Sequence, residues 1–320
     1  MDPEDLELFR RSLRNATNDY TGQALDVALE DVGWLDAMAI EPRVAISTLF
    51  QLQGENNASS SALGHVVCCA LGLSETPATE VVLPAIGQWD PPGTVNGRGL
   101  HVSGLASTAL RDLESVVVIA ATERGDTAIA VPTASLTLES VGGVDPNLGL
   151  LRVTGEDIRT YADLGPTSAD WTSAVALARL AIGHELVGVS RKMLELARQH
   201  ALGRVQFDRP ISSFQAIRHR LAETLVAIEM AEAMLDSAWL DGKSNTAAMA
   251  KAVAGRQART SARHCQQVLA GIGFTREHPL HLYVRRALVL DGLFGTSASL
   301  TRALGKEMIT AGQLPALLPL

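Results

Sequence analysis

Apolar residues recur at steps of three and four from Leu6 to about Ser74, which is the spacing of one face of an α-helix. Glycine, proline or asparagine interrupts the pattern at 33–34, 41–42 and 54–57. The first part of the chain is therefore expected to fold into several short helices that together form an N-terminal helical unit.

A different pattern runs from Val81 to about Val153. Short runs rich in β-branched and small apolar residues stand at 116–119, 128–131 and 136–138. Turn sequences rich in glycine, proline, asparagine and aspartate separate them. The middle of the chain is expected to form a small β domain.

The helical spacing returns after Pro166 and continues to the end of the chain. An unbroken stripe of apolar residues at three- and four-residue steps, from Phe214 to Trp239, indicates one long amphipathic helix. The helices predicted in this part are Ser173–Leu202, Ser213–Leu240, Ser244–Leu269, a short one at Tyr283–Leu290, and Ser297–Ala311. Long helices joined by short connections favour an antiparallel bundle.

Helical, strand-rich and helical segments in this order predict an α+β fold with segregated layers, not an alternating βαβ fold. We expect an N-terminal helical domain over residues 1–78, a β domain over 79–165 and a C-terminal four-helix bundle over 166–320. Hydrophobic residues make up 47% of the 320 residues, so the chain can bury a large core.

Charge and cysteine content narrow the expected partners. The net charge of −8, without a clustered basic stripe, argues against nucleic acid as a partner. Cys68 and Cys69 are adjacent and Cys265 is distant, which fits neither a disulfide framework nor a paired metal motif. No stretch approaches the roughly 20 apolar residues that span a bilayer, so no membrane partner is expected. We expect a cytoplasmic protein.

Three short segments of the predicted bundle carry candidate chemistry. The first contains Arg204, Gln206, Phe207 and Gln215 at a helix junction. An arginine, two amides and an aromatic ring could hold a diphosphate and a flat ring, but polar residues also tie ordinary interhelical turns. The composition of this segment leaves both readings open.

The second segment, 267–274, contains Gln267 and Gly271, and its glycines end a helix and leave backbone groups open to a ligand. The third, 285–296, is another glycine break between helices. Taken singly, both are ordinary helix ends. A metal site is not expected, because the His264-Cys265 pair and the two histidines at 278 and 281 stand on different predicted elements.

In this order and spacing, the three segments resemble the C-terminal signature of the acyl-CoA dehydrogenase family. That signature reads R-x-Q-F-G-x-P-I-x-x-F-Q, then Q-x-x-G-G-x-G-F, then a segment ending in E-G-T. The resemblance covers nearly the whole chain and implies that family's fold, with FAD at a subunit interface. It also implies which residues reach the FAD diphosphate and adenosine of a partner: Arg204, Gln206, Phe207, Gln215, Gln267 and Gly271.

The chain departs from the family at the catalytic base. The family's reaction needs a carboxylate to take the α-proton of an acyl thioester while a hydride passes to the flavin. Phe294 occupies the usual position of that glutamate, and Ala178 occupies the alternative position, immediately before Arg179. Arg179 could face the substrate or form a salt bridge. Asp291, almost one turn before Phe294 and on roughly the same face, is the candidate for a substitute base.

The flavin cradle of the family, T-E-P-x-x-G-S-D, is also missing from the comparable stretch at 82–90. Trp89 in this stretch could stack on a ring, although packing is the commoner role of such a tryptophan.

These losses resemble the short subunits of the α2β2 acyl-CoA dehydrogenases of bacterial steroid breakdown. The resemblance implies a catalytic partner subunit, shared FAD and an acyl-CoA substrate, possibly steroid-derived. Two alternatives stay open: a non-enzymatic scaffold or regulator, and a self-sufficient dehydrogenase that uses Asp291.

Overall fold

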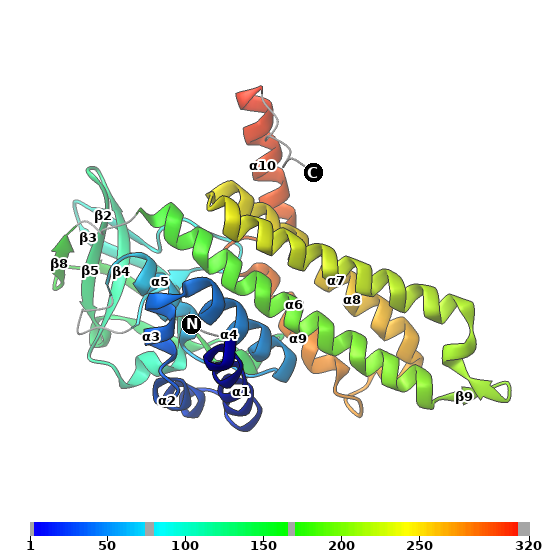
Figure 1. Cartoon of the computed structure of the whole chain (residues 1–320). Coiled ribbons are helices and arrows are strands. Elements are labelled where there is room, and N and C mark those ends of the chain that lie inside the picture. The colour runs from blue at the N-terminus through cyan, green and yellow to red at the C-terminus, as the bar shows by residue number, and fades with distance from the viewer. Residues whose placement is uncertain (1–2, 74–79, 166–169, 313–320) are drawn as a thin grey trace.

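The computed structural model describes residues 3–73, 80–165 and 170–312 (Figure 1). The chain opens with short helices, namely α1 (Pro3–Asp19), α2 (Gln23–Asp31), α3 (Trp34–Ile40), α4 (Pro42–Asn56) and α5 (Ala62–Ala70). Gly33 adopts a left-handed conformation that lets the chain turn into α3, and the Trp34 indole N–H donates to the Ala45 carbonyl at 3.0 Å. Trp34 therefore anchors the core of the N-terminal helices.

The middle of the chain forms one mixed sheet. The strands described in it are β1 (Leu83–Pro84), β2 (Gly93–Asn96), β3 (Gly99–Ser107), β4 (Ser115–Thr122), β5 (Gly125–Pro132), β6 (Thr137–Ser140), β7 (Leu150–Ile158) and β8 (Ala162–Gly165). They are ordered β6-β7-β3-β2-β4-β5-β8, with β1 paired to β3, and β2 and β4 run parallel. The expected runs at 116–119 and 128–131 lie in β4 and β5, which pair along their full length and bury a shared apolar face.

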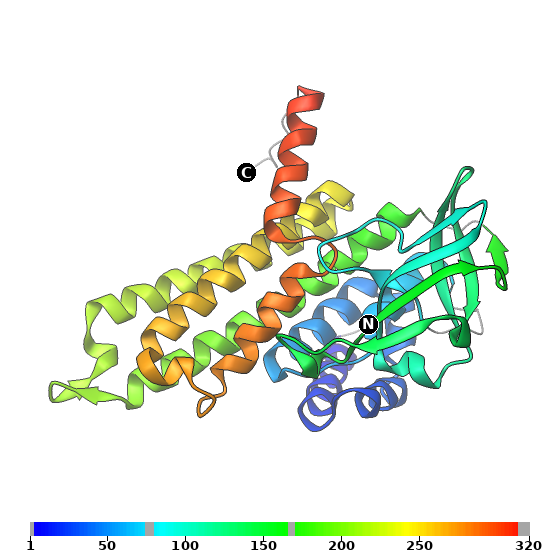
Figure 2. The ribbon, with the colours of Figure 1, turned by 180° about the vertical axis from the view of Figure 1, so that it is seen from behind.

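Long helices complete the chain: α6 (Trp171–Gly203), α7 (Gln215–Asp241), α8 (Ser244–Leu269), α9 (Leu280–Gly292) and α10 (Ser297–Ala311). α9 is longer than predicted because Pro279 takes helical angles and starts the helix before Tyr283. In both views α10 stands away from the rest of the bundle, and most of its residues beyond Leu300 are exposed (Figures 1 and 2).

α6 is the central element and packs against α4, α5, α7, α8 and α9. Two glycines let α4 and α6 touch backbone to backbone. A Cβ at Gly54 would lie 2.2 Å from the Glu185 carbonyl oxygen, and a Cβ at Gly188 would lie 2.0 Å from that of Gln51. This contact fixes the N-terminal helices on the bundle.

The α+β fold class, with N-terminal helices, a middle sheet and C-terminal helices, is confirmed. The predicted domain boundaries at 78/79 and 165/166 fall in or beside the segments 74–79 and 166–169, which lie outside the described residues. α6 is long and apolar enough to cross a membrane, but 78% of its most apolar window is buried inside the protein, as in the core helix of a globular fold.

Candidate functional site

The connection between α6 and α7 is a short β-hairpin at one end of the bundle. β9 (Val205–Gln206) pairs with β10 (Arg209–Pro210), and the residues between them, Phe207 and Asp208, have φ angles of 55° and 62°. Two consecutive left-handed residues define a type I′ turn, which matches the twist of a two-residue hairpin. This turn projects the Phe207 ring, 85% exposed, into solvent.

Arg204 and Gln215 flank the hairpin. Arg204 caps the C-terminus of α6, where its N–H donates to the His200 carbonyl at 2.9 Å, and Gln215 is the first residue of α7. The Arg204 carbonyl accepts from the Ile211 N–H at 2.8 Å and ties the far strand to the helix end. The side chains of Arg204 and Gln215 are both exposed.

Aromatic and cationic contacts hold the base of the hairpin. The Arg209 guanidinium lies 4.3 Å from the centre of the Phe214 ring, and Phe207 meets that ring edge-on with centroids 6.1 Å apart. The Gln206 side chain bonds only the adjacent Val205 carbonyl, at 2.8 Å. Arg209 and Phe207 therefore tie the turn to Phe214, while the exposed side chains of Arg204, Gln206 and Gln215 are open to an external group.

The second predicted segment follows the end of α8. Gln267 is exposed on the last turn of that helix, and Gly271 lies in a 3-10 turn, Ala270–Phe274. A Cβ on Gly271 would meet no described atom within 4 Å, and Gly271 is not among the glycines with positive φ. Neither packing nor backbone angle in the described chain requires glycine here, so the position has room for close approach from outside.

Both segments lie at the end of the bundle farthest from the sheet, where β9 is labelled in Figure 1, because α7 and α8 are antiparallel. Thr224 Oγ1 and His264 Nδ1 join α7 to α8 at 2.9 Å, and the rings of His200 and His278 join α6 to the segment after α8 with centroids 6.5 Å apart. The structure thus brings all six predicted cofactor residues to one end of the bundle, each exposed.

The same end is strongly basic, which the overall charge of −8 conceals. The helix ends and connections that meet there carry Arg204, Arg209, Arg218, Arg220, Arg263 and Arg276, together with His200, His219, His264, His278 and His281. Clustered guanidinium and imidazole groups fit a diphosphate by charge and by hydrogen bonding. Sequence reasoning did not find this cluster, because its members are scattered over about eighty positions.

Phe294 lies between α9 and α10, is 1% exposed and has a left-handed φ of 52°. Two buried cations hold the backbone around it. Lys251 Nζ donates to the carbonyls of Asp291 and Gly295, both at 2.6 Å, and Arg179 Nε donates to the Phe294 carbonyl at 3.1 Å. Desolvation by burial lowers the pKa of Lys251 to about 7 and that of Arg179 to about 10.

Asp291 serves as a buried structural anion. Its carboxylate accepts from Arg259 Nε and Nη2 at 3.0 and 2.6 Å, and from the Ser297 N–H at the start of α10 at 2.9 Å. A Cβ on Gly255 would lie 2.1 Å from its Oδ1, so α8 needs glycine at this crossing. Both oxygens of this buried carboxylate are thus engaged, by Arg259 and by the start of α10, which disfavours Asp291 as a substitute base.

Trp89 packs beside the Phe294 turn. The Trp171 indole N–H donates to the Trp89 carbonyl at 2.8 Å, and a Cβ on Gly295 would lie 2.8 Å from the Trp89 ring. The Arg179 guanidinium lies 5.5 Å from the centre of that ring. Ala178, the other expected base position, is buried in α6. The contacts favour packing for Trp89. Arg179 forms no salt bridge with any described residue, and its Nε instead donates to the Phe294 carbonyl.

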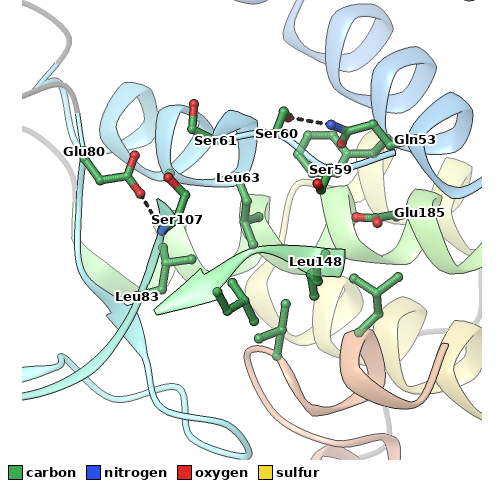
Figure 3. A pocket seen from close by; sticks show the side chains of 15 residues that line it. Gln53, Ser59, Ser60, Ser61, Leu63, Glu80, Leu83, Ser107, Leu148 and Glu185 are labelled. Carbon is green, nitrogen blue, oxygen red and sulfur yellow. Dashed lines mark hydrogen bonds between the residues drawn. The ribbon is translucent and has the colours of Figure 1, made fainter. Parts of the chain in front are cut away.

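A small cavity of about 40 Å³ lies where the N-terminal helices, the sheet and the bundle meet (Figure 3). Glu80 and Glu185 line opposite sides of it, and hydroxyls of the 59–61 segment lie between them. A space of this size holds a few water molecules and is far below the volume of an acyl-chain pocket. Burial raises the pKa of both glutamates to about 7, against the opposing effects of the Ser107 N–H and of Arg286.

The Glu80 carboxyl makes stability depend on pH. Its folded pKa of about 7 lies above the ordinary value of 4.5, so its contribution is fully present below pH 4.5 and is lost as pH rises through 7. We expect Glu80→Gln to match the wild type near pH 4.5 and to gain relative stability by up to about 1.4 kcal/mol per pH unit toward pH 7. Urea unfolding across this range measures the difference. Glu156→Gln, on an exposed face of β7, is the control. If the free energies of unfolding of Glu80→Gln and the wild type changed in parallel with pH, the raised pKa of Glu80 would be contradicted.

One buried ion network joins the three parts of the chain. Arg286 in α9 is fully buried, and its Nε donates to Asp145 at 2.6 Å, from the loop before β7. Its Nη1 donates to Glu185 in α6 at 3.1 Å and to the Ala58 carbonyl at 2.7 Å.

Among the described residues, no cluster of three or more His, Cys, Asp or Glu side chains could hold a metal ion.

Comparison with known proteins identifies the family of the bundle. Residues 169–309 match the family described as acyl-CoA dehydrogenase, C-terminal domain. Over 189 residues the chain is 33% identical to acyl-CoA dehydrogenase IpdE2 of Mycobacterium tuberculosis, which covers 57% of this chain and 57% of that protein. The chain spans less than two thirds of the length of the curated relatives it matches. The bundle is thus an acyl-CoA dehydrogenase C-terminal domain, and the chain belongs to the acyl-CoA dehydrogenase family.

Two solved structures share the whole fold. A variant of the Tcur3481-Tcur3483 steroid ACAD superposes with a TM-score of 0.80 at 20% identity, over 97% of this chain and 98% of that chain. The ChsE4-ChsE5 complex from Mycobacterium tuberculosis superposes with a TM-score of 0.79 at 18% identity, over 99% of each chain. The arrangement of helices, sheet and bundle is therefore that of acyl-CoA dehydrogenases.

Proposed function

We propose that the chain is a subunit of a heteromeric, FAD-dependent acyl-CoA dehydrogenase that completes the FAD site of a catalytic partner and supplies no base of its own. One contrast carries the proposal. The six predicted cofactor residues, called the half-site from here on, are exposed together at a basic end of the bundle. The position of the family's catalytic glutamate, by contrast, holds the buried Phe294.

The residues at the bundle end fit FAD by their chemistry. Arg204 offers a guanidinium for the diphosphate, Gln215 and Gln267 offer amides for its oxygens and the adenosine, and Phe207 offers an exposed ring face. Bound FAD supplies the hydride acceptor of the reaction. The role of this chain is to bind and orient one part of the cofactor.

Proton abstraction is assigned to the partner subunit. The α-proton of an acyl thioester needs a carboxylate nearby, and Phe294 and Ala178 cannot accept a proton. The substrate is an acyl-CoA, and a steroid-derived acyl group is favoured because one neighbour in fold is described as a steroid ACAD. We further propose an α2β2 heterotetramer in the cytoplasm; the two-component names of both neighbours support a partner subunit.

The test is co-expression with a catalytic acyl-CoA dehydrogenase subunit, followed by native mass and flavin absorbance. We expect two FAD per α2β2 complex and a colourless, inactive chain when it is purified alone. A yellow, active chain alone would support the self-sufficient alternative that uses Asp291. An FAD-free site in the complex, with activity unchanged by Arg204→Ala, would support the scaffold alternative.

Phe294 offers an independent check, because the proposal gives its ring no chemical task. Phe294→Leu keeps an apolar side chain in the buried site and is expected to keep both FAD and turnover in the complex within about twofold, since it removes no group that can transfer a proton. Steady-state kinetics and flavin content measure this, with Phe9→Leu in α1 as a matched control for packing. Full loss of turnover with FAD still bound would count against a non-catalytic role for this position.

A further inference from the structure

Histidines are concentrated at the proposed half-site. Of the eight histidines in the chain, five lie at the basic end of the bundle: His200, His219, His264, His278 and His281. None of them belongs to the six residues that the family signature assigns to the cofactor. Because imidazole changes charge near neutral pH, such a group beside a diphosphate alters its binding with pH.

Hydrogen bonds engage four of the five rings. His278 Nδ1 accepts from the Leu280 N–H at 3.2 Å, so protonation at that nitrogen would break the bond at the start of α9. His281 Nδ1 bonds the His278 carbonyl at 2.9 Å, and His264 Nδ1 bonds the Thr224 hydroxyl.

His219 Nε2 and Gln215 Nε2 lie 3.3 Å apart. The His200 ring, by contrast, has no hydrogen bond to any described residue. It is half-buried in the last turn of α6.

His200 is placed to face the same ligand as Arg204. The two residues are four apart at the C-terminal end of α6 and therefore lie on one face of the helix. The edge of the His278 ring approaches His200 from the segment before α9, with centroids 6.5 Å apart. Burial and then the charge of Arg204 lower the pKa of His200 in the free chain.

The elements packed around His200 carry few anionic side chains that could offset the positive charge of Arg204. The hairpin that follows α6 brings Arg209 and Asp208, and the segment before α9 brings Glu277 beside His278. A bound diphosphate would reverse the electrostatic balance, since its negative charge favours the imidazolium form.

We propose that His200 is a further cofactor-binding side chain of the half-site, which contacts the FAD diphosphate as imidazolium. This rests on the proposed function. FAD binding then takes up a proton on His200, and by reciprocity the affinity for FAD rises as pH falls. Coenzyme A also carries a diphosphate, so the test must separate the two ligands.

The experiment measures FAD dissociation from the co-purified complex at pH 6, 7 and 8, with proton uptake measured by calorimetry in two buffers of different ionisation enthalpy. The wild-type dissociation constant is expected to rise about three- to tenfold from pH 6 to pH 8, since one proton changes affinity at most about tenfold per pH unit. His200→Gln should flatten this dependence and remove the proton uptake. His101→Gln, exposed on β3, should behave as the wild type.

Three outcomes separate the hypotheses. An unchanged pH dependence in His200→Gln, with FAD still weakened by Arg204→Ala, would overturn the role of His200 and leave the half-site intact. Unchanged FAD retention in Arg204→Ala would overturn the half-site and this inference with it. If free coenzyme A displaced FAD and its own affinity showed the same dependence on pH, His200 would contact the diphosphate of coenzyme A and not that of FAD. That result would overturn the inference.

Discussion

Arg286→Met is expected to lower the free energy of unfolding at pH 8 by about 3–5 kcal/mol. The substitution removes the guanidinium that pairs with Asp145 and Glu185, and both carboxylates are buried. Without the guanidinium, which holds the pKa of Glu185 down to about 7, the core keeps two carboxyl groups that must either stay there as unpaired charges or take up a proton, and either outcome costs stability. Total stabilities of domains are about 5–15 kcal/mol, so this one change would bring the fold close to unfolding.

Urea unfolding at pH 8 measures the effect. Arg152→Met is the control, because its pairing with Glu139 is 3.7 Å long and exposed on both sides, and such pairs contribute about 0–1 kcal/mol. Arg286→Met combined with Asp145→Asn and Glu185→Gln should recover much of the loss, since the buried charges leave with their partner. A loss under about 1 kcal/mol in the single variant would mean that the network carries little of the stability.

Arg204→Ala is expected to weaken FAD retention in the heteromeric complex by about 10- to 100-fold. The exposed guanidinium makes no ion pair among the described residues, so its removal costs the fold little, whereas a charge-assisted bond to a diphosphate contributes about 1.5–3 kcal/mol. Gln267→Ala should act in the same direction with a smaller effect, because a neutral amide bonds more weakly.

Flavin fluorescence after dilution and gel filtration reports this retention. Arg98→Ala, in the exposed turn between β2 and β3, is the matched control and should retain FAD as the wild type does. Equal retention in Arg204→Ala and Arg98→Ala would remove the main support for the half-site.

The bundle was predictable because each long helix repeats its apolar stripe many times. The ends of α8 and α10 agree with the sequence prediction, whereas α9 begins three residues early because Pro279 is tolerated at a helix start. Local signals of this kind suffice to predict the helices, and they also mark the glycine-containing segments from which the half-site is proposed.

Long-range partners were not predictable. Arg286 and Asp145 are 141 residues apart, and Arg286 and Glu185 are 101 apart, so no local pattern links them. The role of Lys251 was not predictable either. In the sequence it is one lysine in an alanine-rich helix, but its ammonium group donates to two backbone carbonyls around Phe294. The basic bundle end likewise arises from helix ends that only folding brings together.

The buried basic side chains around Phe294 bear on whether a carboxylate could evolve at this position and act as a base. A single change to glutamate would place a carboxylate near Arg179 and Lys251, whose charges would lower its pKa and weaken it as a proton acceptor. Relieving this by changing Arg179 or Lys251 would release the carbonyls that hold the turn. Under the proposed function, regaining a base at this position would thus require several coordinated changes, which favours lasting dependence on a catalytic partner.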